Sequence, residues 1–426
     1  MSRSAVDARR KLFLELYGSD QEALQIRRYE QLLKRYEEFF GGEEAQLFSA
    51  PGRTEIGGNH TDHNHGRVLA AAVNLDAIAA AAPTNNDLVM IYSDTYPHPF
   101  EVSLRDLTPQ KNEERTTSAL IRGIAARFQT LGYAVGGFHA CLASNVMIGS
   151  GLSSSACIEV LLGTIMNVFY NKGKIPAIEV AKIGQYAENV YFKKPCGLMD
   201  QIACALGGIV AIDFEDPEKP VIEKIDFDFA AQHHSLVVVN TGGSHADLTD
   251  DYAAIPAEMK SVAGKLGGKV CRDISLENVI GHCRALRTQL GDRALLRALH
   301  FLHENQRVAE QVAALNKGDF AAFLALVRAS GNSSWKWLQN CASTQNPTEQ
   351  SIALALALTE DFLKEENSGA CRVHGGGFAG TIQVFMPETR VSDYTKLMET
   401  IFGEGAVTVL RIRNCGVQYV SAEKIH

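Results

Sequence analysis

The chain has 426 residues, 46% of them hydrophobic and 21% charged, with a formal net charge of −8. This acidic balance argues against nucleic acid or an anionic membrane as the main partner. No apolar run reaches the length of about 18 residues that a membrane span needs. The first ten residues lack an apolar signal core, and the nine cysteines contain no Cys-x-x-Cys pair. We therefore expect a cytoplasmic protein with reduced thiols. The sequence leaves the oligomeric state open, with a monomer favoured.

The length exceeds that of one typical core, so two domains are expected, residues 1–233 and 234–426. Apolar periodicity and turn residues predict the elements of the first domain. They are a helix over 20–40, strands over 45–50, 68–82 and 87–93, a helix over 117–131, a strand over 137–147, helices over 153–170 and 178–190, and strands over 207–214 and 221–227. The second domain is mixed. Its elements are a strand over 235–241, helices around 252–267, 275–290, 293–315, 319–329 and 350–364, and strands around 369–374, 381–386 and 407–413.

The segment from Arg53 to Gly66 holds an arginine, an aspartate, three histidines and three glycines in fourteen residues. Polar groups this dense, beside glycines that allow close backbone approach, indicate a polar ligand held from several sides. A metal site is the alternative, because His and Asp are natural ligands of zinc or manganese. Its candidates are His60, Asp62, His63 and His65. In an extended segment they point in two directions, so they converge only across a tight turn.

A second segment lies between an expected strand and an apolar helix. It consists of Gly149, Ser150, Gly151, Leu152, Ser153, Ser154, Ser155 and Ala156. Glycines and small hydroxyls at a helix N-terminus aim backbone N–H groups at one point, where the helix dipole favours an anion. A simple serine cap is the plainer interpretation. The segment is neither a Walker A loop nor a hydrolase elbow.

Two later segments complete the pattern. Gly375, Gly377 and Gly380 spell Gly-x-Gly-x-x-Gly, but the β-branched continuation from Thr381 predicts a strand where a dinucleotide fingerprint requires a helix. We therefore expect a glycine loop between two strands. Further upstream, Asp200 is the one acid in Lys-Pro-Cys-Gly-Leu-Met-Asp-Gln, where it is either functional or a plain helix-start residue.

These four segments, in this order, resemble the GHMP small-molecule kinases and, within them, the galactokinase family. The first segment is similar to the galactokinase signature Gly-Arg-Val-Asn-Leu-Ile-Gly-Glu-His-Thr-Asp-Tyr-Asn, without a gap. The resemblance implies an α+β fold with an N-terminal domain like ribosomal protein S5, a ferredoxin-like C-terminal domain and a site in the cleft. It also implies ATP and Mg²⁺ as cofactors. The implied reaction is phosphorylation of a monosaccharide at its anomeric hydroxyl, with galactose converted to galactose 1-phosphate.

The resemblance implies roles residue by residue. Asp200 would be the base facing the anomeric hydroxyl, and Arg53 would neutralise developing charge. Ser155 and Glu188 would hold Mg²⁺, and residues 149–156 would bind ATP. The implied sugar contacts are Asn59, His60, Asp62, Gly197 and Tyr252, and the implied glycine loop is Gly375, Gly376 and Gly377. Arg53 should lower the pKa of Asp200 while burial should raise it; the sequence does not decide between them.

The chain departs from the signature at three positions. Asn59 stands where galactokinases carry a glutamate that contacts the sugar's 6-hydroxyl, Glu55 replaces an asparagine and His63 replaces a tyrosine. Galacturonate is therefore a second candidate substrate, with Arg67 or His63 as the only candidate cations for its carboxylate. We expect Asn59→Glu to keep or improve galactose phosphorylation. A sugar sensor without turnover and a metallohydrolase are the alternatives from other classes.

Overall fold

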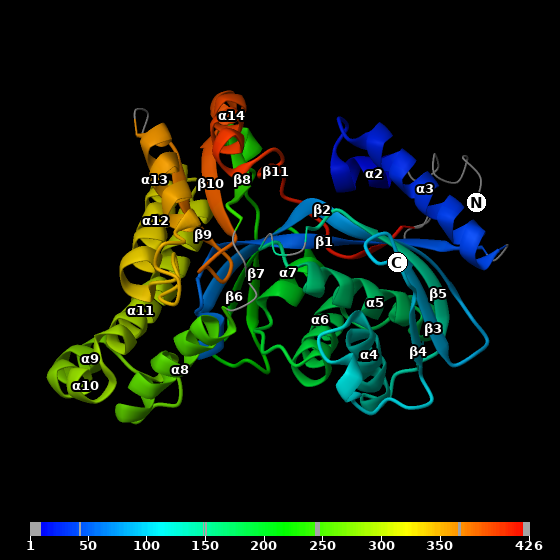
Figure 1. The fold of residues 1–426 in the computed structure, drawn as a ribbon, viewed down its shortest axis with the longest axis horizontal. Helices are drawn as coiled ribbons and strands as arrows, with labels where there is room; N and C mark the ends of the chain where they lie inside the picture. The colour runs from blue at the N-terminus through cyan, green and yellow to red at the C-terminus, as the bar shows by residue number, and fades with distance from the viewer. Residues whose placement is uncertain are drawn as a thin grey trace.

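The structure, a computed structural model, describes residues 10–41, 44–147, 149, 151–242, 248–364 and 368–420. It is built on two sheets (Figure 1). The larger one has eight strands in the order β12-β1-β2-β5-β3-β4, with β6 paired to β2 and β7 paired to β6. Its strands are β1 (Gln46–Gly57), β2 (Arg67–Pro83), β3 (Leu88–Ser93), β4 (Phe100–Ser103), β5 (Phe138–Ser144), β6 (Ile209–Asp213), β7 (Val221–Ile225) and β12 (Gln418–Tyr419).

Helices cover both faces of this sheet (Figure 1). One face packs against α4 (Thr117–Thr130), α5 (Ser154–Asn171), α6 (Ala177–Tyr186) and α7 (Met199–Leu206), and the other against α2 (Arg10–Tyr17) and α3 (Glu22–Phe40). Strand β2 alternates between the two cores: Ala77, Ala79 and Ala81 belong to the first, and Ile78, Ala80 and Ala82 to the second. Because successive strand residues point to opposite faces, burial on both faces explains why this stretch is apolar at every position.

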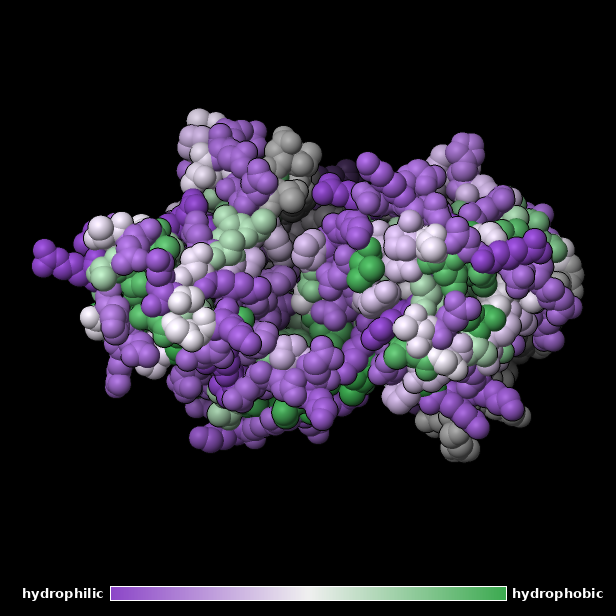
Figure 2. Space-filling view, turned by 90° about the horizontal axis from the view of Figure 1, so that it is seen from below, coloured by the Kyte–Doolittle hydropathy of each residue, from purple (hydrophilic) through white to green (hydrophobic). Residues whose placement is uncertain are grey.

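The smaller sheet is antiparallel, in the order β11-β8-β10-β9. Its strands are β8 (His234–Asn240), β9 (Ala370–His374), β10 (Thr381–Pro387) and β11 (Val407–Leu410). One face packs against α13 (Ser351–Leu363) and α14 (Val391–Phe402), and α12 (Phe320–Ser333) contacts the other. The remaining helices are α8 (Thr249–Lys265), α9 (Leu276–Gly281), α10 (Cys283–Leu290) and α11 (Asp292–Asn316). Polar residues cover most of the face in Figure 2, which is hollowed between the two halves of the molecule.

The expected α+β class is confirmed, and most expected elements appear with ends shifted by a few residues. The strand expected over 45–50 is longer, since β1 continues to Gly57. The elements that the sequence did not predict are α2, α14, β4 and β12, and the helix expected over 275–290 breaks at His282 into α9 and α10. The division at residue 233 stays a prediction. The two sheets draw their strands from either side of it, except that β12 returns to the first sheet. Within the described ranges, no helix is long and apolar enough to cross a membrane.

A buried carboxylate joins the two ends of the chain to the large sheet. Asp76 of β2 has no exposed surface. It pairs with Arg28 of α3 at 2.5 Å and with Arg413, which follows β11, at 3.2 Å. The hydroxyls of Tyr17 and Ser49 each donate a hydrogen bond of 2.5 Å to its Oδ2 atom. Burial would raise the pKa of Asp76, but the two arginines and the hydroxyls bring it below its usual value. Four separate segments thus depend on one ionised group.

We expect Asp76→Ala to destabilise the protein by about 3–5 kcal/mol, because it leaves the buried Arg413 and the partly buried Arg28 without their counter-charge. The midpoint of urea unfolding measures this. Asp292→Ala is the matched control, since it removes the carboxylate of the exposed Arg287–Asp292 pair and should leave the midpoint unchanged. Equal midpoints for Asp76→Ala and wild type would contradict the role given to Asp76.

Candidate active site

The first motif begins in strand β1 and ends in a tight turn over residues 58–66. Strand β2 follows this turn. Thr61 closes the turn, since its backbone N–H and its hydroxyl both donate to the Gly58 carbonyl. His60 has a left-handed φ of 60°, and His65 one of 61°, a conformation uncommon for residues other than glycine. The turn therefore presents His60 and Asp62 close to the end of the strand that carries Arg53.

The second motif lies against both β1 and the glycine loop. The Arg53 backbone N–H donates to the Leu152 carbonyl at 3.0 Å. Gly151 has a φ of 72°, and a Cβ at this position would lie 2.7 Å from the Nδ1 atom of His374. Ser153, just before α5, has a left-handed φ of 56°. Ser150 lies outside the described residues. The N-terminus of an 18-residue helix, approached by a glycine-rich loop, has the form of an anion site.

Asp200 lies in the first turn of α7 and faces both earlier motifs. Its Oδ1 atom accepts from the Nε atom of Arg53 at 2.8 Å, and its Oδ2 atom accepts from the Ser153 hydroxyl at 2.5 Å. Burial would raise the pKa of Asp200, but the charge and hydrogen bond of Arg53, with help from Ser153, keep the net pKa below its usual value. The balance that the sequence left open is thus decided in favour of the arginine. The carboxylate stays ionised at neutral pH and is 26% exposed.

Glu188 and Ser155 are brought together as expected. Glu188 lies in a π-helical turn over residues 187–192, a feature frequent at functional sites. Its Oε1 atom accepts from the Ser155 hydroxyl at 2.9 Å and from the Lys194 ammonium, also at 2.9 Å. In the described ranges, no three His, Cys, Asp or Glu side chains converge as a metal cluster would require. Mg²⁺ in nucleotide sites needs fewer protein ligands, because phosphates and water supply the rest. One hydroxyl and one carboxylate, both hard oxygen donors, fit that kind of site.

The sequence did not identify Gln201, Glu159 and Lys194 as residues around Glu188. The Nε2 atom of Gln201 donates to Glu188 at 3.0 Å and to Glu159 at 2.9 Å. Glu159 has no exposed surface. Burial, with the nearby charge of Glu188, raises the pKa of Glu159 well above its usual range, which favours its protonated form. In the sequence, an acid within the apolar helix 153–170 could have pointed to Glu159. The Lys193-Lys194 pair could have pointed to Lys194.

The expected sugar contacts, apart from Asn59, lie together around Gly197 and Gly376. A Cβ on Gly197 would lie 1.8 Å from the Oδ2 atom of Asp62, and one on Gly376 would lie 2.5 Å from the Tyr252 ring. The His60 ring lies 4.9 Å from that of Tyr252 and hydrogen bonds to the Gly376 carbonyl at 2.9 Å. Burial lowers the pKa of His60 to about 3, so the ring is neutral. Its buried Nδ1 atom has no partner among the described residues.

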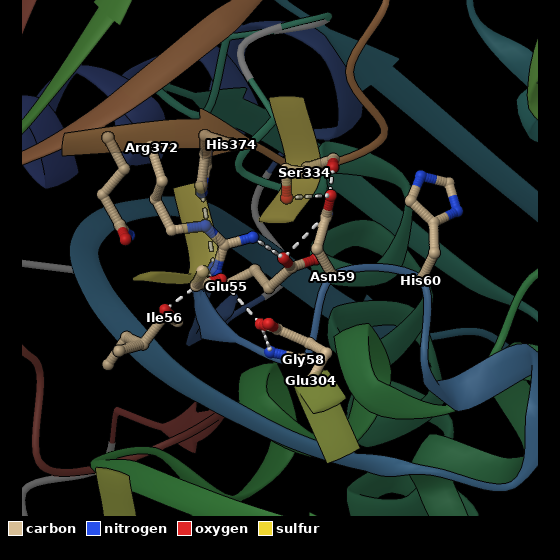
Figure 3. A network of polar contacts seen from close by, with 12 residues as sticks. Glu55, Ile56, Gly58, Asn59, His60, Glu304, Ser334, Arg372 and His374 are labelled. Carbon is tan, nitrogen blue, oxygen red and sulfur yellow. Dashed lines mark hydrogen bonds and ion pairs between the residues drawn. The ribbon is translucent and has the colours of Figure 1, made fainter. Parts of the chain in front are cut away.

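The Asn59 side chain does not lie with the other expected sugar contacts. It points into a buried polar network with Glu55 and Arg372, whereas His60 stands apart from that network (Figure 3). Asn59 has no exposed surface, so a direct contact with a sugar would require its hydrogen bonds to break. Arg67, one of the two cations considered for a 6-carboxylate, instead pairs with Asp213 at 2.7 Å.

Comparison with known proteins agrees with this geometry. Residues 34–83 match the model of the galactokinase galactose-binding signature, and residues 119–208 match that of the GHMP kinase N-terminal domain. The chain is 31% identical to a galactokinase of Streptomyces coelicolor, over 89% of this chain and 94% of that protein. It is 29% identical to a galactokinase of Glaesserella parasuis, over 85% and 91%. The crystal structure of Lactococcus lactis galactokinase complexed with galactose superposes with a TM-score of 0.78 and 23% identity, covering 92% of this chain and 99% of that one.

The match of residues 119–208 to the GHMP kinase model, on a two-sheet fold with glycine-rich loops before α5 and between β9 and β10, places the chain among the GHMP kinases. Within this class, the extent and identity of the match to the Streptomyces protein decide the family. The chain belongs to the galactokinase family.

Proposed function

We propose that this protein transfers the γ-phosphoryl group of ATP to the anomeric hydroxyl of galactose, producing galactose 1-phosphate and ADP. The observation that carries the proposal is the convergence of Arg53, Ser153 and Asp200 at the N-terminus of α5. Both curated relatives described above are galactokinases, and the first motif matches a galactose-binding signature. Phosphoryl transfer depends mainly on positioning and on electrostatic stabilisation, which these groups can supply.

In this proposal, Asp200 orients the anomeric hydroxyl and accepts its proton as the bond to phosphorus forms. Its low pKa keeps it ready to accept a hydrogen bond at neutral pH. Arg53 holds the carboxylate in place and brings positive charge to the transferring phosphoryl group. The loop over residues 149–156 binds the ATP phosphates through backbone N–H groups at the start of α5.

The sugar lies, in the same proposal, against His60, Asp62, Gly197 and Tyr252. Neutral His60 has a free ring nitrogen, which can accept a hydrogen bond from a sugar hydroxyl. The absence of a side chain at Gly197 leaves room for Asp62. Galactose is preferred over galacturonate because a 6-carboxylate needs a committed cation. Of the two candidates, Arg67 already pairs with Asp213, and the His63 ring lies 3.8 Å from the Asp62 carboxylate.

Ser155 and Glu188 are the residues that would hold Mg²⁺. When bound, the ion would supply positive charge to the phosphates of the nucleotide. The ammonium group of Lys194 forms an ion pair with Glu188. This supports the proposal that Glu188 attracts positive charge. Gln201 orients the other oxygen of Glu188.

The proposed reaction is tested with wild-type protein, ATP, Mg²⁺ and a panel of galactose, glucose and galacturonate. We expect ADP to form fastest with galactose, and phosphorus NMR should show the product phosphorylated at C1. Higher kcat/KM for galacturonate would overturn the assigned substrate. Sugar binding without ADP formation would indicate a sensor in place of an enzyme.

Asp200→Asn should lower kcat by about 10²-fold or more, the range of general-base contributions. Galactose affinity should fall only modestly, because the amide keeps the size of the side chain. A coupled ADP assay gives kcat, and calorimetry gives the galactose affinity. Asp361→Asn, which alters the exposed pair with Lys364, is the control and should match wild type. Near-normal turnover in Asp200→Asn would remove Asp200 as the base.

Glu188→Gln should raise the Mg²⁺ concentration needed for the half-maximal rate, because a neutral amide is a weaker ligand for a hard cation than a carboxylate. Calorimetric titration with ADP at several Mg²⁺ concentrations provides a readout that is independent of turnover. Glu310→Gln, on the exposed side of α11, is the matched control. If both variants require the same Mg²⁺ as wild type, Glu188 does not hold the metal.

A further inference from the structure

Glu55 and Asn59 are reversed relative to the galactokinase signature, which has asparagine at the first position and glutamate at the second. In the structure the two side chains touch: the Asn59 Nδ2 atom donates to the Glu55 Oε1 atom at 3.0 Å. Both are buried, with 4% of Glu55 and none of Asn59 exposed. One carboxylate and one amide therefore share a closed space, and their order along the chain is exchanged.

The charge at residue 55 has a buried counter-ion. The Nη2 atom of Arg372 on β9 pairs with Glu55 Oε1 at 2.5 Å, and the Nη1 atom donates to the Ile56 carbonyl at 2.8 Å (Figure 3). Arg372 has no exposed surface. Burial raises the pKa of Glu55, whereas the charges of Arg372 and Arg53 oppose that rise. A carboxylate inside a protein is stabilised when it is paired and hydrogen bonded in this way.

Asn59 also forms hydrogen bonds with the glycine loop, with Asn340 and with His300. Its Nδ2 atom also donates to the Gly375 carbonyl at 2.7 Å, and its Oδ1 atom accepts from Asn340 at 2.8 Å. Its backbone carbonyl accepts from the Nε2 atom of His300 at 3.0 Å. The next residue, His60, has a left-handed φ of 60° and bonds to the Gly376 carbonyl. Asn59 and His60 therefore each bond to the same loop, at Gly375 and at Gly376.

We propose that Glu55 and Asn59 form a coupled pair, in which Asn59 is a positioning residue for His60 and the Gly375–Gly377 loop. The link to sugar binding rests on the proposed function, whereas the coupling of the two side chains does not. The negative charge of the signature lies at residue 55, paired with Arg372. Residue 59 therefore does not set the preference at C6 of the sugar by direct contact.

A glutamate at residue 59 alone would place two carboxylates beside a single arginine. Like charges in a shared, desolvated site are strongly unfavourable. This replaces the expectation from the sequence that Asn59→Glu keeps or improves activity on galactose. Restoring the order of the signature in both positions should remove the conflict, since one amide and one carboxylate again fill the space.

The test compares wild type with Asn59→Glu, Glu55→Asn and the double variant. We expect Asn59→Glu to lower kcat/KM for galactose by about tenfold or more and to lower the unfolding temperature, in keeping with coupling between residues in contact. The double variant should recover most of both losses, and its recovery should include KM for galactose. If the two substitutions acted independently, their losses in kcat/KM and in unfolding temperature would add, and the double variant would not recover.

Asn316→Glu is the matched control. Asn316 also donates to a glutamate, Glu223, at 2.9 Å, but on the exposed surface, so its substitution should change neither readout. An Asn59→Glu variant equal to or better than wild type would overturn the proposal. So would a double variant no better than the worse single one, including a double variant that fails to fold. If wild type does not phosphorylate galactose, the proposed function fails, while the unfolding temperatures of the four proteins still decide the coupling.

Discussion

Strand β1 carries two buried charges, and the site depends on how they are paired. Arg53 and Glu55 are two residues apart, and each takes its partner from a different half of the chain: Asp200 for the arginine and Arg372 for the glutamate. A buried charge that loses its partner costs several kcal/mol. These pairs therefore fix α7 and β9 against the same short stretch of strand. The cleft residues acquire their positions from this double constraint.

A second balance of charge lies at the start of α5. Glu159 and Glu188 share the amide nitrogen of Gln201, a distance at which two ionised carboxylates would repel each other strongly. Burial and the charge of Glu188 raise the pKa of Glu159, which favours its neutral form and lessens this repulsion. The other oxygen of Glu188 accepts hydrogen bonds from Ser155 and Lys194. Glu159 is thus linked to Glu188 through the amide of Gln201.

Local sequence was sufficient for the features that depend on short-range chemistry. The glycine loop was expected between two strands and lies between β9 and β10, because the residues after Gly380 favour strand. The proximity of Ser155 to Glu188 followed from the resemblance. The direction of the Asn59 side chain did not, since it depends on Glu55, Gly375 and Asn340 together. Pairing partners hundreds of residues apart leave no local pattern, so Arg413 and strand β12 were missed as well.

Contacts between residues far apart in the sequence have a consequence for folding during synthesis. Asp76 needs Arg28 early in the chain and Arg413 near its end, and β12 adds Tyr419 beside Phe48 on the edge of β1. A ribosome exposes these partners at very different times. Between the synthesis of β7, which ends at Ile225, and that of residues 413–419, the first sheet therefore has an incompletely paired Asp76 and an open strand edge, which are features that favour aggregation. Contacts of such long sequence separation also slow folding. The pairing of Phe48 with Tyr419 and of Ser49 with Gln418 forms only after residues 418–419 have been made, so the first sheet reaches its native edge long after its other strands exist.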